Sequence, residues 1–346
     1  MIMKKQLLLL VMMVLPLVAS ADVVEIEGIY YNLMEKPREA EVTKNPSKYL
    51  GNIVIPERIL YGEKEFIVTS IGKEAFYKCS ELYNVSIPNS VSRICTSAFF
   101  GCSGLSSIII PNSVTNIGLS AFYGCTGLTN IIIPNSVTTI DNSAFSGCTG
   151  LISISIPNSI IVIDMEVFKN CTGLTNIIIP NSVTTIDNSA FRGCAGLTSI
   201  SIPNSVTFLG VGSFRDCVNL TSITLGEGID FLCERAFGGC YNITDVYCYM
   251  TKLTSNMDIN AFKDSYIEYT TLHVPMSAIS TYQTYEPWKN FKEIVALTND
   301  DPKPTGVDKI VITNNNKGVF YDLNGRRVEN PSKGIYIKNG KKVIMK

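Results

Sequence analysis

The side chains of this chain whose number and spacing could do chemistry are its eleven cysteines, among 346 residues. Thiols in this number could form disulfides, bind zinc or serve as nucleophiles. Their spacing favours none of these roles, because eight of them recur every 23 residues and no C-x-x-C motif occurs. The eight are Cys79, Cys102, Cys125, Cys148, Cys171, Cys194, Cys217 and Cys240.

A regular spacing predicts that these cysteines stack, one on each turn of a repeating fold. Parallel strands lie ~4.8 Å apart, and parallel Cβ atoms at that distance miss the ~3.8 Å that a disulfide prefers. Cys95 and Cys233 share a second repeat position, but six periods separate them, so they are too far apart to pair. We expect buried free thiols that behave as small apolar side chains.

Other catalytic candidates are few. His273 is the one histidine, and it lies in the strand-like stretch TLHVP, which indicates a structural role. Asp141, Asp164 and Asp187 recur at one repeat position, where Asp suits a turn; a calcium-binding stripe is the alternative. No P-loop, G-x-S-x-G or G-x-G-x-x-G motif is present. We therefore expect no enzymatic activity, no cofactor and no metal.

The spacing of the cysteines belongs to a longer repeat. The segment TGLTNIIIPNSVTTIDNSAF occupies residues 126–145 and returns unchanged at 172–191. The unit A-F-x-x-C-x-x-L-x-x-I-x-I-P-N-S-V-x-x-I runs without a slip, so Phe recurs eight times from Phe76 to Phe237. A fixed period of 20 to 50 residues predicts a solenoid, in which stacked coils bury a continuous core.

One coil shows how this sequence should fold. Leu128, Ile131 and Ile133 alternate as in a short strand with one face buried. Residues 134–136 (Pro-Asn-Ser) predict a turn, residues 137–140 a second extended piece, and residues 141–145 the corner that leads to the next coil. The residues between the inward ones must face solvent.

These units resemble the BspA-type leucine-rich repeats of bacterial surface proteins. The stretch GIYYNLMEKPREAEVTK (28–44) is similar to that family's N-terminal cap, and TLHVPMSAISTYQTYEPWKNFKEIV (271–295) to its closing segment. The resemblance implies a β-rich solenoid, a right-handed coil stack of 23-residue leucine-rich repeats between N- and C-terminal caps. It also implies adhesion to extracellular matrix.

The flanking segments complete the expected organisation. Residues 1–21 have the charged start, apolar run and A-x-A site of a signal peptide, so the chain should be exported to the cell surface or the extracellular space, with no transmembrane segment in the mature chain. We expect an N-terminal β cap at 22–70, repeats at 71–250, a C-terminal cap at 251–297 and a linker at 298–306. Residues 307–346 predict a small β-hairpin domain that resembles the C-terminal sorting modules of Bacteroidetes exported proteins; the alternative is a small β appendage with solvated lysines.

The outward strand positions offer a surface without charge. We predict that an extracellular protein, of the host matrix or of a partner cell, binds to this surface. An uncharged sheet with apolar spots is a usable interface. Alternatives are a glycan-binding face for polysaccharide or mucin, a structural spacer, or residues that merely suit a β surface. Nucleic acid is excluded, since phosphate binding needs Lys and Arg. The predicted partner-binding residues are Ser107, Ile109, Asn130, Ile132, Ser153, Ser155, Asn176, Ile178, Ser199, Ser201, Thr224 and Tyr247.

Overall fold

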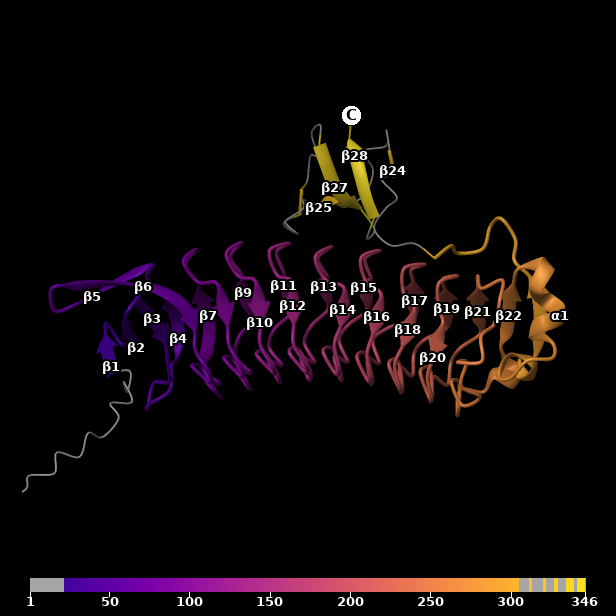
Figure 1. Ribbon diagram of the computed structural model, residues 1–346, viewed down its shortest axis with the longest axis horizontal. Helices are drawn as coiled ribbons and strands as arrows, with labels where there is room; N and C mark the ends of the chain where they lie inside the picture. The colour runs from indigo at the N-terminus through magenta and orange to yellow at the C-terminus, as the bar shows by residue number, and fades with distance from the viewer. Residues whose placement is uncertain are drawn as a thin grey trace, which may run out of the picture.

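The computed structural model describes residues 22–304 and five strands between residues 311 and 345. Residues 22–304 form an elongated stack of coils, each rising beside the last (Figure 1). The predicted signal peptide at 1–21 lies outside the described residues. The expected solenoid with a 23-residue repeat is confirmed.

Each coil contributes a strand of three to five residues to one long side of the stack. These strands pair in parallel with the equivalent strands of the neighbouring coils, one repeat away. They are β7 (Leu82–Ser86), β9 (Ser107–Ile109), β11 (Asn130–Ile132), β13 (Ser153–Ser155), β15 (Asn176–Ile178), β17 (Ser199–Ile202), β19 (Ser222–Leu225) and β21 (Asp245–Cys248).

The opposite side of the stack carries strands of two residues, which lie in the predicted second extended piece of each coil. They too pair in parallel from coil to coil. They are β8 (Arg93–Ile94), β10 (Asn116–Ile117), β12 (Thr139–Ile140), β14 (Val162–Ile163), β16 (Thr185–Ile186), β18 (Phe208–Leu209) and β20 (Phe231–Leu232).

The N-terminal strands extend both sides of the stack. β6 pairs in parallel with β8, and β4 pairs in parallel with β7, so the first coil has a strand neighbour on each side. Antiparallel pairs join β1 to β2, β2 to β3 and β5 to β6. Their bounds are β1 (Asp22–Ile26), β2 (Ile29–Glu35), β3 (Arg38–Val42), β4 (Gly51–Val54), β5 (Arg58–Tyr61) and β6 (Lys64–Ile71).

At the other end, two strands continue the β21 side in parallel, and short helices pack over the last coil. These elements are η1 (Ile267–Tyr269), β22 (Thr271–Val274), η2 (Met276–Ala278), α1 (Ile279–Tyr282), η3 (Trp288–Asn290) and β23 (Glu293–Ala296). A separate small sheet follows, made of β24 (Val311–Ile312), β25 (Phe320–Tyr321), β26 (Arg327–Val328), β27 (Gly334–Lys338) and β28 (Lys341–Met345). No helix among the described residues is both long and apolar enough to cross a membrane.

Two side-chain ladders form the core. The repeated Phe rings are buried and stack face to face from coil to coil, as between Phe122 and Phe145, whose centroids are 5.3 Å apart and whose planes differ by 1°. Beside them the eight repeated cysteines are buried and free, and all but the first donate a hydrogen bond to a Phe carbonyl of the preceding coil. Stacking therefore buries what one coil alone would expose.

The corners depend on backbone that few residues tolerate. Ser143 has φ 56° and Gly147 has φ 72°, both in the left-handed region. The equivalent residues of the next coil, Glu166 and Asn170, have φ 59° and 57°. Each coil thus turns twice through left-handed backbone, and this geometry aims the next strand back along the same side of the stack.

Candidate functional site

The candidate site is the outward surface of the long strands, here called the sheet face. It carries two columns of side chains on β4, β7, β9, β11, β13, β15, β17, β19, β21, β22 and β23. Ile109 pairs with Ile132, and Asn130 pairs with Ser107, so the predicted residues of neighbouring coils lie directly beside one another. The strands rather than the sequence order bring these residues together.

Most of the predicted residues face solvent. Ile109 is the most prominent, with 81% of its surface exposed, and Ile132 follows at 39%. Ile178, Ser201 and Tyr247 are half-buried. The remaining exposed members are Ser107, Asn130, Ser153, Ser155, Asn176 and Ser199.

The prediction for Thr224 was wrong, because this side chain is 3% exposed. Its strand neighbour Tyr247 is a large ring that stacks on His273 with centroids 4.3 Å apart. Exposure in this column falls from Ile109 to Thr224, and Tyr247 after it is half-buried, so the open part of the sheet face lies over β4 to β15. Thr224 cannot contact a partner in this arrangement.

The sequence interpretation missed one exposed apolar residue of the sheet face. Val54 on β4 is 71% exposed and pairs with Ser86, so it begins the column that contains Ile109. A signal was present, because the I-x-I-P pattern of each coil also occurs as Ile53-Val54-Ile55-Pro56. This copy falls 32 residues before Val85-Ser86-Ile87-Pro88 and is therefore out of phase with the repeat.

The open part of the sheet face is uncharged. Its outward columns from β4 to β15 contain Asn, Ser, Val and Ile alone. Such a surface has hydrogen-bonding groups and separate apolar contacts but no electrostatic steering. It suits a protein surface that has both apolar and polar groups. It does not suit a nucleic-acid backbone, because phosphate binding needs Lys and Arg.

The thiols offer no reactive group. Burial raises the pKa of Cys102 to about 12 and that of Cys248 to about 11, which keeps them protonated and unreactive at neutral pH. Burial, and then the neighbouring carboxylates of Asp141 and Asp187, raise the pKa of Asp164. Within residues 22–304 no group of three or more His, Cys, Asp or Glu side chains is placed to hold a metal ion.

Two aromatic side chains at the C-terminal end of the sheet face are already engaged. Tyr247 stacks on His273, and Tyr249 donates a hydrogen bond from its hydroxyl to the carbonyl of Pro302 at 3.2 Å. A sugar ring needs a free aromatic face on which to stack. These two tyrosines do not provide one, whereas Tyr83 on β7 is 53% exposed.

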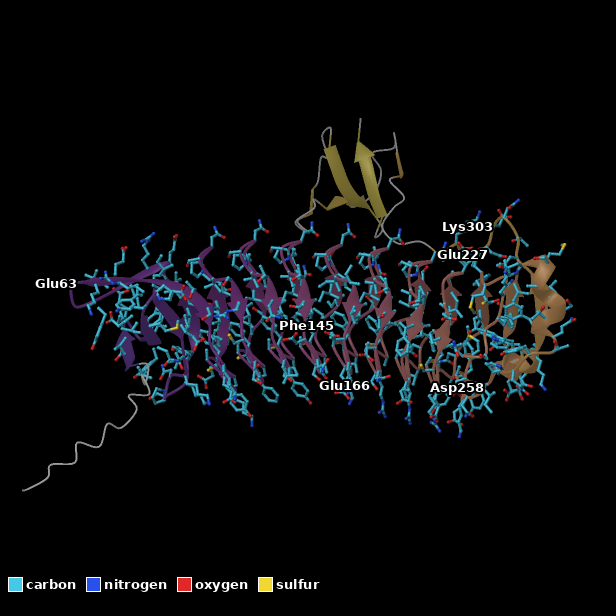
Figure 2. The ribbon with its side chains drawn as sticks, in the orientation of Figure 1. Glu63, Phe145, Glu166, Glu227, Asp258 and Lys303 are labelled. Carbon is cyan, nitrogen blue, oxygen red and sulfur yellow. The ribbon has the colours of Figure 1, made fainter. Side chains whose placement is uncertain are left out.

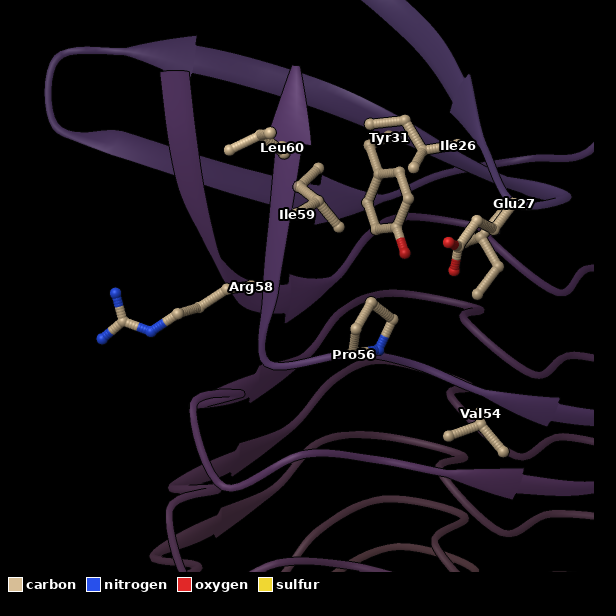
Figure 3. A pocket seen from close by; sticks show the side chains of 9 residues that line it. Ile26, Glu27, Tyr31, Val54, Pro56, Arg58, Ile59 and Leu60 are labelled. Carbon is tan, nitrogen blue, oxygen red and sulfur yellow. The ribbon is translucent and has the colours of Figure 1, made fainter. Parts of the chain in front are cut away.

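A smaller hollow of about 230 Å³ opens at the N-terminal end, near Pro56 and Ile59 (Figure 3). Tyr31 lies at its floor, and its buried hydroxyl has no hydrogen-bond partner among the described residues. Arg58 points away from the hollow and pairs with Glu65 at 2.7 Å. More of its accessible wall is polar than apolar, and the hollow is small, so it is a minor site beside the sheet face.

The comparisons with known proteins agree on the fold. A leucine-rich repeat protein from Bacteroides ovatus is 25% identical, with a TM-score of 0.61 over 79% of this chain and 76% of that one. A leucine-rich cell surface protein from Faecalibacterium prausnitzii is 22% identical, with a TM-score of 0.55 over 81% of this chain and 96% of that one. No curated protein matches the sequence.

The family model described as "BspA type Leucine rich repeat region" matches in six copies, over residues 69–191 and 161–286. These ranges cover the coils from β6 to α1, and they include every strand of the open sheet face except β4. The protein therefore belongs to the BspA-type leucine-rich repeat family.

Proposed function

We propose that this protein is an exported, non-enzymatic adhesion protein that binds an extracellular protein, of the host matrix or of a partner cell, through its sheet face. The observation that carries the proposal is the row of exposed apolar side chains in one uncharged column, led by Val54, Ile109 and Ile132. The column does not need apolar residues, since Ser86 and Ser155 occupy it in other coils. An apolar side chain exposed at such a position contributes to the fold only its strand propensity.

The repeat supports binding of an extended partner. Equivalent positions recur at each parallel strand, ~4.8 Å apart, so a partner that contacts one coil can repeat the contact on the next. Without charge to accelerate association, affinity has to accumulate from several such contacts. A long fibrous or repetitive matrix protein meets this requirement better than a small ligand.

The test is an array of mammalian matrix proteins and mucin glycans probed with the purified protein. We expect saturable binding to one or more matrix proteins, with little change between 50 and 300 mM salt, because the sheet face lacks charge. Binding to glycans alone would favour the alternative of a glycan-binding module. Binding to neither class would favour a structural spacer.

A further inference from the structure

The residues after β23 return along the stack. The N–H of Leu297 donates to the carbonyl of Val274 at 2.8 Å, and the carbonyl of Pro302 accepts from Tyr249 at 3.2 Å. Figure 2 shows Lys303 at the upper edge of the stack, toward its C-terminal end. Residues 297–304, here called the strap, therefore run from β23 back toward β21, although most of them fall in the predicted linker.

An acidic residue attaches the strap beside the histidine. The side chain of Asp301 is 13% exposed, and its Oδ2 accepts from the N–H of Thr298 at 2.6 Å. The same oxygen lies 4.0 Å from Nδ1 of His273. The other ring nitrogen, Nε2, lies 3.1 Å from Oδ1 of Asp245 on β21. The imidazole is thus placed between one carboxylate of the sheet and one of the strap.

The surroundings of the imidazole are acidic. β21 presents Asp245 and Tyr247, the strap presents Asp301, and Glu293 on β23 accepts a hydrogen bond from Thr271. Burial, followed by the carboxylates of Asp245 and Asp301, raises the pKa of Tyr247. Within the described chain neither Asp245 nor Asp301 forms an ion pair with Lys or Arg, so His273 is their available cation.

The proton on the ring decides how many carboxylates it can hold. A neutral imidazole donates from one nitrogen, whereas a protonated imidazole donates from both and carries a positive charge. Histidine is the side chain that ordinarily changes charge between pH 5 and 8. Only the protonated ring can attract Asp245 and Asp301 together.

We propose that the strap is a pH-sensitive cover that closes over the C-terminal end of the sheet face when His273 is protonated and opens when it loses its proton. This inference rests on the proposed function, because the end that is covered, at Tyr247, belongs to the same surface. A partner that extends from the open coils toward β21 then reaches Tyr247 above neutral pH. In an acidic environment the strap excludes it from β21.

The test is amide hydrogen exchange of the full purified protein at pH 5.5 and pH 8.0, corrected for the intrinsic effect of pH. We expect the exchange of residues 297–303 to be about tenfold slower, after correction, at pH 5.5 than at pH 8.0. Asp301→Asn and His273→Gln should both abolish this difference. Asp300→Asn is the matched control, since its side chain is exposed beside Asp301, and it should behave as the wild type.

Equal protection of the strap at both pH values in the wild-type protein would overturn the proposal, and this comparison needs no variant. An Asp301→Asn profile identical to that of Asp300→Asn would overturn it as well. Exchange at β13 should be the same in every sample and reports that the variants are folded. Because no partner is present, the strap and the adhesion function fail independently: a pH-dependent strap without matrix binding would refute the function alone.

Discussion

The thiol of Cys148 donates a hydrogen bond to the backbone carbonyl of Phe122, with 3.1 Å between Sγ and the oxygen. Phe122 belongs to the preceding coil, so the bond joins two neighbours of the stack through their buried side chains and backbone. The same contact recurs on the flanking coils, between Cys125 and Phe99 and between Cys171 and Phe145. The repeated cysteine is therefore part of the coil-to-coil bonding, which explains its presence without disulfides.

This arrangement predicts the reactivity of the thiols. Burial raises the pKa of Cys171 and Cys240 to about 12, so at pH 8 the thiolate that reacts with a disulfide reagent is scarce and also inaccessible. Titration of the native protein should modify at most Cys95 and Cys233, which are half-buried. Denaturation without reductant should release close to eleven thiols. Mass mapping that finds several disulfides in the native protein would contradict the stacked register.

The phenylalanine ladder predicts where stability comes from. Phe145 is fully buried between Phe122 and Phe168, with centroids 5.3 and 5.8 Å away. Phe145→Ala should lower the free energy of unfolding by about 3–5 kcal/mol through lost burial and the cavity left behind. Ser155→Ala, on the exposed column of the sheet face, should change it by less than about 0.5 kcal/mol. Urea denaturation measures both, and similar costs would show that the inward and outward positions are misassigned.

Close contact between coils makes one glycine position sensitive. A Cβ at residue 150 would lie 2.3 Å from the carbonyl oxygen of Thr126, so Gly150→Ala must push two coils apart. We expect a loss of more than about 2 kcal/mol of unfolding free energy in the same denaturation experiment.

The matched control for Gly150 is Gly147, which has φ 72° but where a Cβ would come no closer than 3.7 Å to the backbone of Gly124. Asn170 and Asp216 occupy its equivalent position in other coils with φ 57° and 61°. Gly147→Asn should therefore cost less than about 1 kcal/mol, because Asn tolerates left-handed backbone. If Gly147→Asn lowered the free energy of unfolding more than Gly150→Ala, close contact between the coils would not be the reason that residue 150 must be glycine.

The repeat made most of the fold predictable. The period holds from Phe76 to Phe237, so equivalent residues have the same environment in each coil. Once the buried and exposed positions of one coil are assigned, those of the other coils follow. The alternation of Leu128, Ile131 and Ile133 placed the exposed residues Asn130 and Ile132 between buried ones, as the structure has them. The buried cysteines followed from the same logic.

The ends of the stack could not be predicted in this way, because they depend on contacts that have no period. Thr224 occupies the same repeat position as Ile109, yet it lies near the end where Tyr247 and the strap pack. Val54 lies outside the 23-residue register, so its place beside Ser86 follows only from the pairing of β4 with β7. The attachment of Asp301 near His273 likewise joins residues 28 positions apart through the fold alone.

Apolar contact at Ile109 is the central requirement of the proposed adhesion function. An unpaired carboxylate buried in an interface is costly, whereas serine at this position is already accepted by the fold at Ser86 and Ser155. Ile109→Asp should therefore eliminate binding through the sheet face, and Ile109→Ser should weaken it by about tenfold, the equivalent of ~1.4 kcal/mol. Thr126→Asp, on an exposed turn outside the sheet face, supplies the charge control.

The most direct measurement is the Kd of these three variants and the wild type for the matrix protein that binds most tightly on the array, at pH 8 and with circular dichroism to verify folding. The account predicts a loss of at least about 100-fold for Ile109→Asp, corresponding to ~2.7 kcal/mol, and an unchanged Kd for Thr126→Asp. A folded Ile109→Asp protein that binds as tightly as the wild type would show that the partner does not use the sheet face.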